Sequence, residues 1–176
     1  MKQKMMVVIL LMSLLWVTGN AAPEQPLQVK KKAAFRYVYM PFTGSYKTMP
    51  QKIQQFTTEF FKQGLQPNGS LISCYHNSPE QVAESELKWD IGFPVAENVS
   101  VKAPLKIGMY QQKNVLEYLH KGPYEDLPRV YEKLKQFLDR KGLDLSLPTY
   151  EFYLNSPLEV KPQELMTRIE IPVKQK

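Results

Sequence analysis

Apolar and polar residues follow two different spacings along the chain, and the change of spacing predicts where strands and helices lie. Residues 35–42 are rich in aromatic and β-branched side chains, which is typical of a strand. Between Met49 and Phe60, apolar residues recur at intervals of four, three and four, so they share one face of a helix. Gly64 follows as a helix-ending residue. The first half therefore begins with a strand and a helix.

Two further strands are expected after this helix. Residues 71–76 form an apolar segment that ends at the turn-forming residues 77–79. Residues 87–95 alternate strictly, with Leu87, Trp89, Ile91 and Phe93 on one side of the strand. The second half repeats this order: strand segments within 105–120, a helix whose inward residues run from 127 to 138, and strands at 149–154 and 165–173. The pattern predicts an α+β fold of two β-α-β-β units, with antiparallel sheets and one main helix each.

The two halves are related by an internal duplication. Residues 44–95 align without a gap to residues 122–173, at an offset of 78 residues, and 15 of the 52 aligned positions are identical. The motif Tyr-x-Asn-Ser-Pro occurs in both halves. Two repeats are too few for a solenoid, so they are expected to form one domain around a central seam. Repeat one spans about residues 34–95, and repeat two about 105–173.

The N-terminal residues have the composition of a secretory signal peptide. Lys2 and Lys4 precede an apolar run over residues 5–17, which is short for a membrane span, and small residues follow at 19–22. The pattern predicts a signal at 1–21 cleaved after Ala21, a linker at 22–33 and a domain at 34–176. The mature chain of 155 residues would be periplasmic or secreted, without a stable membrane anchor. An uncleaved N-terminal anchor is the alternative.

Charge and composition exclude several classes of function. The formal net charge of +6 falls to +4 on signal cleavage, which is too mild and dispersed to predict nucleic-acid binding. One cysteine and two histidines argue against Cys-rich and multi-His metal sites, and nucleotide-binding and protease motifs are missing. We expect no metal and no cofactor. His76 and His120 are interpreted as hydrogen-bonded side chains, and Cys74 as a small buried hydrophobe.

Alternation within the strands assigns candidate functional residues to one face of the sheet. We expect Ile72 and Cys74 to face the helices, together with their counterparts in the strand at 149–154. Ser73, Tyr75, Glu151 and Tyr153 then share the opposite face, where a seam between repeats could hold a ligand. Glu151 aligns with Ser73, so only one repeat carries the acidic group. This asymmetry favours a functional role for Glu151.

A carboxylate among tyrosines suits a cationic ligand, because ring faces attract positive charge and the anion supplies a partner. The same group could act as a general acid or base if burial raised its pKa. The simplest alternative is an exposed glutamate on a strand surface. Further candidate ligand contacts are Tyr37, Tyr39, Trp89 and Tyr110, although the phase of Trp89 also suits core packing.

Two motifs resemble a known family. The sequence His-Lys-Gly-Pro-Tyr at 120–124 is similar to the H-x-G-P-Y motif at the helix entry of GyrI-like domains. The segments 150–157 and 162–173 resemble the C-terminal signature of that family, with Ser156 where Asp is usual. The resemblance covers about residues 34–174. The family is also called the effector-binding domain of AraC- and MerR-type regulators.

The resemblance implies a duplicated β-α-β-β fold with a central pocket for amphipathic or cationic compounds. It also implies that Glu151 is the characteristic acidic residue of that pocket. Some stand-alone relatives hydrolyse cyclopropane-bearing toxins and others bind partner proteins. Three hypotheses follow: an exported small-molecule-binding protein with Glu151 as the acidic contact, a hydrolase of strained or electrophilic xenobiotics that uses Glu151 as its catalytic residue, and a protein-interaction module without a small ligand.

Overall fold

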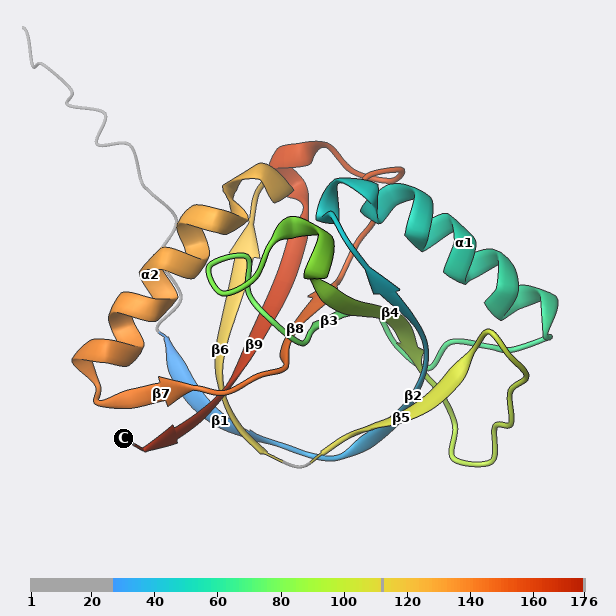
Figure 1. The fold of residues 1–176 in the computed structure, drawn as a ribbon, viewed down its shortest axis with the longest axis horizontal. Helices are drawn as coiled ribbons and strands as arrows, with labels where there is room; N and C mark the ends of the chain where they lie inside the picture. Colours follow the sequence, from blue (N-terminus) through green and yellow to red (C-terminus); the bar gives the residue numbers. More distant parts are fainter. Residues whose placement is uncertain (1–26, 112, 176) are drawn as a thin grey trace, which may run out of the picture.

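The computed structural model describes residues 27–111 and 113–175, and it confirms the expected α+β fold with antiparallel strands. Two helices lie above a strongly curled sheet (Figure 1). The helices are α1 (Met49–Lys62) and α2 (Leu127–Arg140). The strands are β1 (Gln28–Lys32), β2 (Phe35–Thr43), β3 (Leu71–Tyr75), β4 (Lys88–Pro94), β5 (Lys106–Tyr110), β6 (Lys113–Lys121), β7 (Leu143–Leu145), β8 (Thr149–Tyr153) and β9 (Met166–Gln175). The predicted signal peptide lies outside the described residues.

The duplication seen in the sequence extends to the elements themselves. Each of β2, α1 and β3 begins and ends 78 residues before its counterpart in β6, α2 and β8. Each helix has a proline in its first turn, where a missing N–H costs nothing. Gly64 and Gly142 follow the helices with φ of +72° and +64°, a left-handed conformation that favours glycine over other residues. The repeated glycines and prolines therefore set matching helix limits in both halves.

The N-terminal segment differs from the prediction. Residues 28–32, which fall in the predicted linker, form strand β1 and pair antiparallel with β6 of the other repeat. Its counterpart β5 pairs with β2 in the same manner. Each repeat thus places its first strand beside the other repeat. The sequence pattern did not predict this strand, because its three lysines interrupt any alternation of apolar residues. Lysines are tolerated here because β1 lies at the edge of the sheet.

The sheet curls so far that distant strands touch across its inner face. The strand order is β1-β6-β9-β8-β3-β4-β2-β5, and β7 pairs with β9. The hydroxyl of Tyr110 on β5 nevertheless donates to Glu170 on β9 at 2.6 Å, five strands away along the sheet. An aromatic cluster fills this inner face. Its buried members are Tyr37, Ile72, Cys74, Tyr110, Tyr150 and Phe152.

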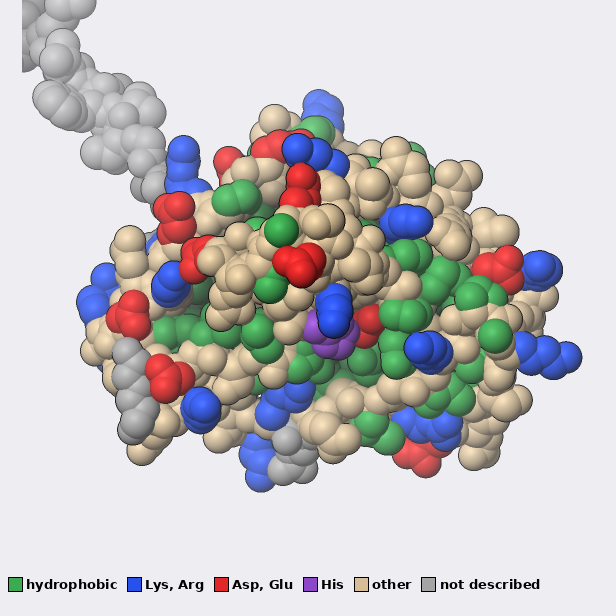
Figure 2. All heavy atoms as spheres, in the orientation of Figure 1, with side chains coloured by type: hydrophobic (Ala, Val, Ile, Leu, Met, Phe, Trp, Pro, Cys, Tyr) green, Lys and Arg blue, Asp and Glu red, His purple; other side chains and the backbone are tan. Residues whose placement is uncertain are grey.

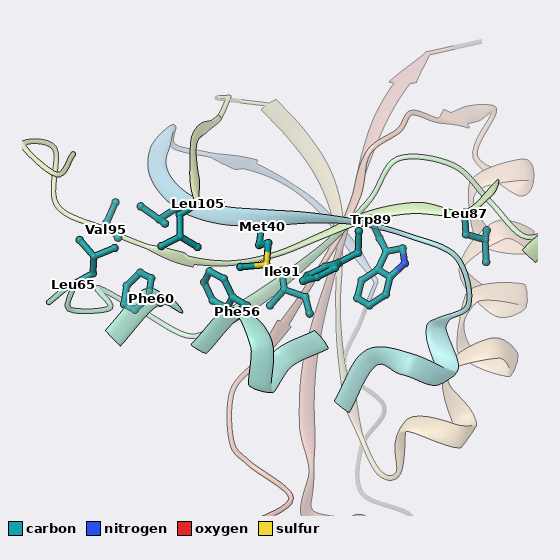
Figure 3. Packing of buried hydrophobic residues seen from close by; sticks show 11 residues of the cluster. Met40, Phe56, Phe60, Leu65, Leu87, Trp89, Ile91, Val95 and Leu105 are labelled. Carbon is teal, nitrogen blue, oxygen red and sulfur yellow. The ribbon is translucent and has the colours of Figure 1, made fainter. Parts of the chain in front are cut away.

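Both helices pack on the outer face of the sheet. Phe56 and Phe60 of α1 belong to one buried cluster with Met40, Ile91 and Trp89 (Figure 3). In the second repeat, a matching cluster joins α2 to β6 and β9 through Leu116, Leu134, Leu138, Ile169 and Ile171. The predicted orientation of the central strands was therefore wrong. Ile72 and Cys74 face the interior of the curl, whereas Ser73 and Tyr75 lie on the helix-bearing face.

Among the described residues, neither helix has the length and apolar character needed to cross a membrane.

Candidate functional site

The two repeats meet at the pairing of β3 with β8. Ser73 lies opposite Glu151 in this antiparallel pair, and the two residues are also equivalent in the 78-residue repeat. The local pseudo-twofold axis therefore passes through the Ser73–Glu151 pair. On the helix-bearing face, this point is reached by side chains from both helices, as the contacts below show.

Three tyrosine hydroxyls hold the Glu151 carboxylate. Tyr75 and Tyr153 donate to Oε2 at 3.0 and 2.9 Å, and Tyr131 of α2 donates to Oε1 at 2.9 Å. The Tyr153 hydroxyl also lies 3.2 Å from the hydroxyl of Ser73 and 3.5 Å from the sulfur of Met49 on α1. Glu151 itself is only 3% exposed, so the alternative of a solvent-exposed strand residue was wrong.

Two further tyrosines complete an aromatic cage, the term used below for Tyr46, Tyr75, Tyr124, Tyr131 and Tyr153. The ring of Tyr46 meets that of Tyr75 edge-to-face at 5.1 Å. Its repeat counterpart Tyr124 meets Tyr153 in the same way at 5.5 Å. All five rings are half-buried, whereas the carboxylate below them is buried. The site is thus an aromatic surface with a shielded acid beneath it.

Burial controls the electrostatics of this cage. Removal from water raises the pKa of Glu151, and the hydrogen bonds from Tyr131, Tyr153 and Tyr75 oppose that rise. Burial and the adjacent carboxylate also raise the pKa of Tyr75, Tyr131 and Tyr153 well above the ordinary value. The tyrosines of the cage therefore remain neutral donors, and the charge at this site near neutral pH is that of the Glu151 carboxylate beneath them.

The polar chemistry of the cage breaks the repeat symmetry at two contacting positions. Tyr46 and Tyr75 have tyrosine counterparts in the second repeat, but Glu151 aligns with Ser73 and Tyr131 aligns with Ile53. The two residues unique to repeat two are hydrogen-bonded to each other. Packing of two equivalent units does not require that both Glu151 and Tyr131 differ from their counterparts. The paired difference therefore supports a functional role for Glu151 and Tyr131.

Some of the site residues predicted from the sequence lie next to Glu151, and others lie elsewhere in the fold. Tyr75 and Tyr153 contact Glu151, as expected from their shared face. Trp89 instead lies fully buried in the core below α1, where its Nε1 donates to the carbonyl of Gly44 at 3.1 Å. Tyr37, Tyr39 and Tyr110 belong to the cluster on the inner face of the curl. They are therefore on the other side of the sheet from Glu151.

Sequence reasoning did not select Tyr46, Tyr124 and Tyr131 as site residues. Tyr46 and Tyr124 were visible as an identical pair of the repeat, and Tyr124 belongs to the helix-entry motif. Tyr131 was assigned to the inward face of its helix, where periodicity does not distinguish a core contact from a hydroxyl donor. Its alignment with Ile53 was the signal that could have revealed it.

The inner face carries a second group of polar side chains. The Lys113 ammonium lies between the rings of Tyr110 and Tyr150, 4.4 and 4.5 Å from their centroids. Near the end of β3, His76 Nε2 lies 2.7 Å from Asp90 Oδ2, and Cys74 lies beside them. Burial and the charge of Asp90 raise the pKa of the Cys74 thiol to about 12, so the thiol is a poor nucleophile.

Two surface hollows of the described chain are lined by residues other than Glu151. One, of about 260 Å³, is lined by Tyr39, His76, Trp89 and Asp90 among others. The other lies over polar residues of α1. The tyrosine side chains thus cover Glu151 in this conformation. Over the face seen in Figure 2, basic, acidic and apolar side chains are interspersed.

Comparison with known proteins identifies the family. The model of the GyrI-like small molecule binding domain matches residues 25–174, and the chain belongs to that family. No protein of curated function has a significantly similar sequence.

Solved structures share the fold at low sequence identity. The C-terminal domain of EcmrR is 19% identical with a TM-score of 0.76, covering 86% of this chain and 98% of that domain. In the EcmrR–DNA complex this chain spans 58% of the EcmrR chain. A hydrolase from Listeria innocua is 14% identical with a TM-score of 0.61, covering 88% of this chain and 94% of that one. SAV2435, solved with bound tetraphenylphosphonium, is 15% identical with a TM-score of 0.56, covering 85% and 94%.

Proposed function

We propose that this protein binds an organic cation with aromatic or amphipathic character, and that Glu151 is its anionic contact. The observation that carries the proposal is the position of the carboxylate beneath five half-buried tyrosine rings. Aromatic faces attract cations, and a buried carboxylate attracts them more strongly than an exposed one because water screens it less. Small-molecule binding is the property of the family to which the chain belongs.

The cage also selects against neutral and anionic ligands. A ligand that enters the site separates tyrosine rings and leaves Glu151 in an environment with little water. A positive charge compensates for that loss of solvation better than a neutral group, because its attraction to the carboxylate is strong where water is scarce. Tetraphenylphosphonium, the compound bound to SAV2435, is a suitable probe because its charge is surrounded by four aromatic rings.

Calorimetric titration of the mature protein with tetraphenylphosphonium tests the proposal. We expect one equivalent to bind, and Glu151→Gln to weaken affinity at least about tenfold, or 1.4 kcal/mol. Triphenylphosphine oxide, a neutral analogue, should bind weakly to both proteins. Glu80→Gln is the matched control, because it removes an exposed carboxylate and changes the net charge equally. Equal affinity of wild type and Glu151→Gln would reject the role of Glu151.

A second, more conservative variant shows whether a loss of binding in Glu151→Gln comes from misfolding. Tyr131→Phe removes one donor to Glu151 and retains the ring. It should keep one equivalent of binding with altered affinity, whereas Tyr118→Phe, in the core cluster below α2, should bind like wild type. Well-folded proteins that bind no cation at all would favour a protein-interaction module instead.

Hydrolysis is the second candidate function, and the raised pKa of Glu151 favours it. A buried carboxyl group of this kind can transfer a proton to or from water during attack on a strained or electrophilic xenobiotic. Two solved structures from Listeria innocua are described as hydrolases. Product analysis separates the candidates, because an enzyme releases more than one equivalent of product and a binding protein releases none.

The proposal places the binding site outside the cytoplasm. It rests on the charged start, apolar run and small residues of the first 22 positions. Expression of the full chain in a Gram-negative host, followed by fractionation and intact-mass measurement, tests this location. The expected product begins at Ala22, contains 155 residues and is absent from the cytoplasmic fraction. A full-length cytoplasmic product would contradict export without affecting the ligand proposal.

A further inference from the structure

A compact group of metal-ligating side chains lies on the inner face, across the sheet from the aromatic cage. Cys74, His76 and Asp90 each offer one ligand atom, and these atoms lie within 4.8 Å of one another. Cys74 and His76 are two residues apart along the β3 direction, so both point to the same face. Asp90 on β4 is the cross-strand partner of Cys74. Two adjacent strands therefore bring the three groups together.

The backbone at this point is regular, which fixes the positions from which the three side chains extend. The His76 N–H continues the ladder beyond β3 by donating to the carbonyl of Lys88 at 2.9 Å. Cys74 and Asp90 are buried at 1% and 5% exposure, whereas the His76 side chain is 40% exposed. Two ligands are thus held rigidly, and the third can adjust from the solvent side.

The group is confined to the first repeat. The positions equivalent to Cys74, His76 and Asp90 are Phe152, Leu154 and Arg168. In the second repeat, Arg168 lies 4.1 Å above the ring of Phe152, so an aromatic and cationic pair replaces the thiol and the acid. The fold is therefore stable at these positions without any ligating residue, and the presence of three in one repeat calls for a chemical explanation.

We infer that Cys74, His76 and Asp90 bind a divalent transition-metal ion such as zinc(II). One sulfur, one imidazole nitrogen and one carboxylate oxygen are all common zinc donors, with zinc–ligand distances of about 2.0–2.3 Å. The present separation of 2.7 Å between His76 Nε2 and Asp90 Oδ2 widens slightly to admit the ion. On binding, the Cys74 sulfur forms a bond to the metal and its proton passes to solvent.

Three protein ligands leave one position of a tetrahedral zinc ion open. His76 and Asp90 also line the hollow of about 260 Å³, together with Tyr39 and Lys88. Water or a small ligand in this hollow would supply the fourth donor. Because the site lies on the opposite sheet face from Glu151, it is independent of the proposed cation site.

Cobalt(II) absorption provides a test specific for this site, because Cys74 is the only cysteine of the chain. Metal-free mature protein, without an affinity tag, is titrated with cobalt(II) and then with zinc(II). We expect a thiolate-to-cobalt charge-transfer band that saturates at one equivalent and disappears when zinc displaces the cobalt. Absence of the band from folded wild-type protein would overturn the inference.

Variants identify the other two ligands. Asp90→Asn and His76→Gln should each weaken zinc affinity by about 10- to 100-fold, whereas His120→Gln, which removes the only other histidine, should retain wild-type affinity. Circular dichroism verifies the fold of each variant before titration. Zinc affinity that is unchanged in both Asp90→Asn and His76→Gln would show that the ion binds elsewhere, which would equally overturn the site.

Discussion

At the scale of single residues, the burial of the Glu151 carboxylate reduces the stability of the domain. Its carboxylate is surrounded by protein, and three hydroxyl donors only partly replace the water it has lost. Ser73, its counterpart in the first repeat, occupies the same kind of position without charge. A domain selected for stability alone would have little reason to place an acid at this point.

The raised pKa of Glu151 predicts a pH-dependent difference in stability between wild type and Glu151→Gln. A folded-state pKa above the unfolded one gives stability that is complete below the unfolded pKa, near 4.3, and is lost as pH rises through the folded pKa. We therefore expect Glu151→Gln to gain stability relative to wild type as pH rises above the unfolded pKa, measured by urea unfolding. A difference between the two proteins that is constant with pH would contradict the prediction.

At the scale of elements, β1 contacts the second repeat through ion pairs that differ in burial. Lys32 Nζ lies 2.9 Å from Oε1 of Glu170, which is buried on β9, and it also contacts Glu117 on β6. Lys30, two residues earlier, reaches Glu117 at 2.6 Å but is itself 48% exposed. The two lysines therefore lie on the same strand and face while differing in burial.

This difference predicts unequal effects of two similar substitutions. Lys32→Met should lower the free energy of unfolding by about 2 kcal/mol, because it leaves the buried Glu170 with Arg168 as its remaining cationic partner. Lys30→Met should cost less than about 1 kcal/mol, as is usual for exposed pairs. Chemical denaturation of both variants measures the two values. Equal losses would mean that β1 is held by its backbone pairing and not by the Lys32 ion pair.

The elements also show how far the sequence determines this fold. The repeat offset predicted α1, α2 and four of the strands closely, because residues 44–95 retain identities with 122–173. Strands β1 and β2 share no identical residue with β5 and β6 at the same offset, so the duplication there is visible only in the structure. Alternation correctly grouped Ser73 with Tyr75, but both faces of the central strands are buried. Apolar character therefore did not show which face packs on the helices. The face that carries Ile72 was predicted to contact the helices, but it lies on the inner face of the curled sheet.

At the scale of the whole molecule, the pseudo-twofold arrangement makes access to Glu151 a joint property of both repeats. Tyr46 and Tyr75 come from the first repeat, and Tyr124, Tyr131 and Tyr153 from the second. Tyr46 and Tyr124 form the outer, symmetry-related pair, and each packs edge-to-face on an inner tyrosine. Because these rings cover the carboxylate, the proposed cation would reach it only if rings from the two repeats separated.

This requirement gives the proposed binding a kinetic prediction. Tyr124→Ala removes one outer ring, so association of tetraphenylphosphonium should accelerate, by roughly tenfold, towards the rates of sites that need no opening. Dissociation should accelerate more, because the ring also supplies cation–π contact. Tyr46→Ala should accelerate association and dissociation in the same way, because Tyr46 is the counterpart of Tyr124 in the first repeat.

Tyr39→Ala is the control for these kinetics, since Tyr39 belongs to the inner-face cluster on the other side of the sheet. Stopped-flow measurement of ligand association and dissociation in all three variants shows whether the ligand enters at the helix-bearing face or at the inner face of the sheet. Faster exchange in Tyr46→Ala and Tyr124→Ala, with Tyr39→Ala unchanged, locates entry between the helices. The reverse result would place the ligand inside the curl, near the further candidate contacts Tyr37, Tyr39 and Tyr110, and would separate ligand binding from Glu151.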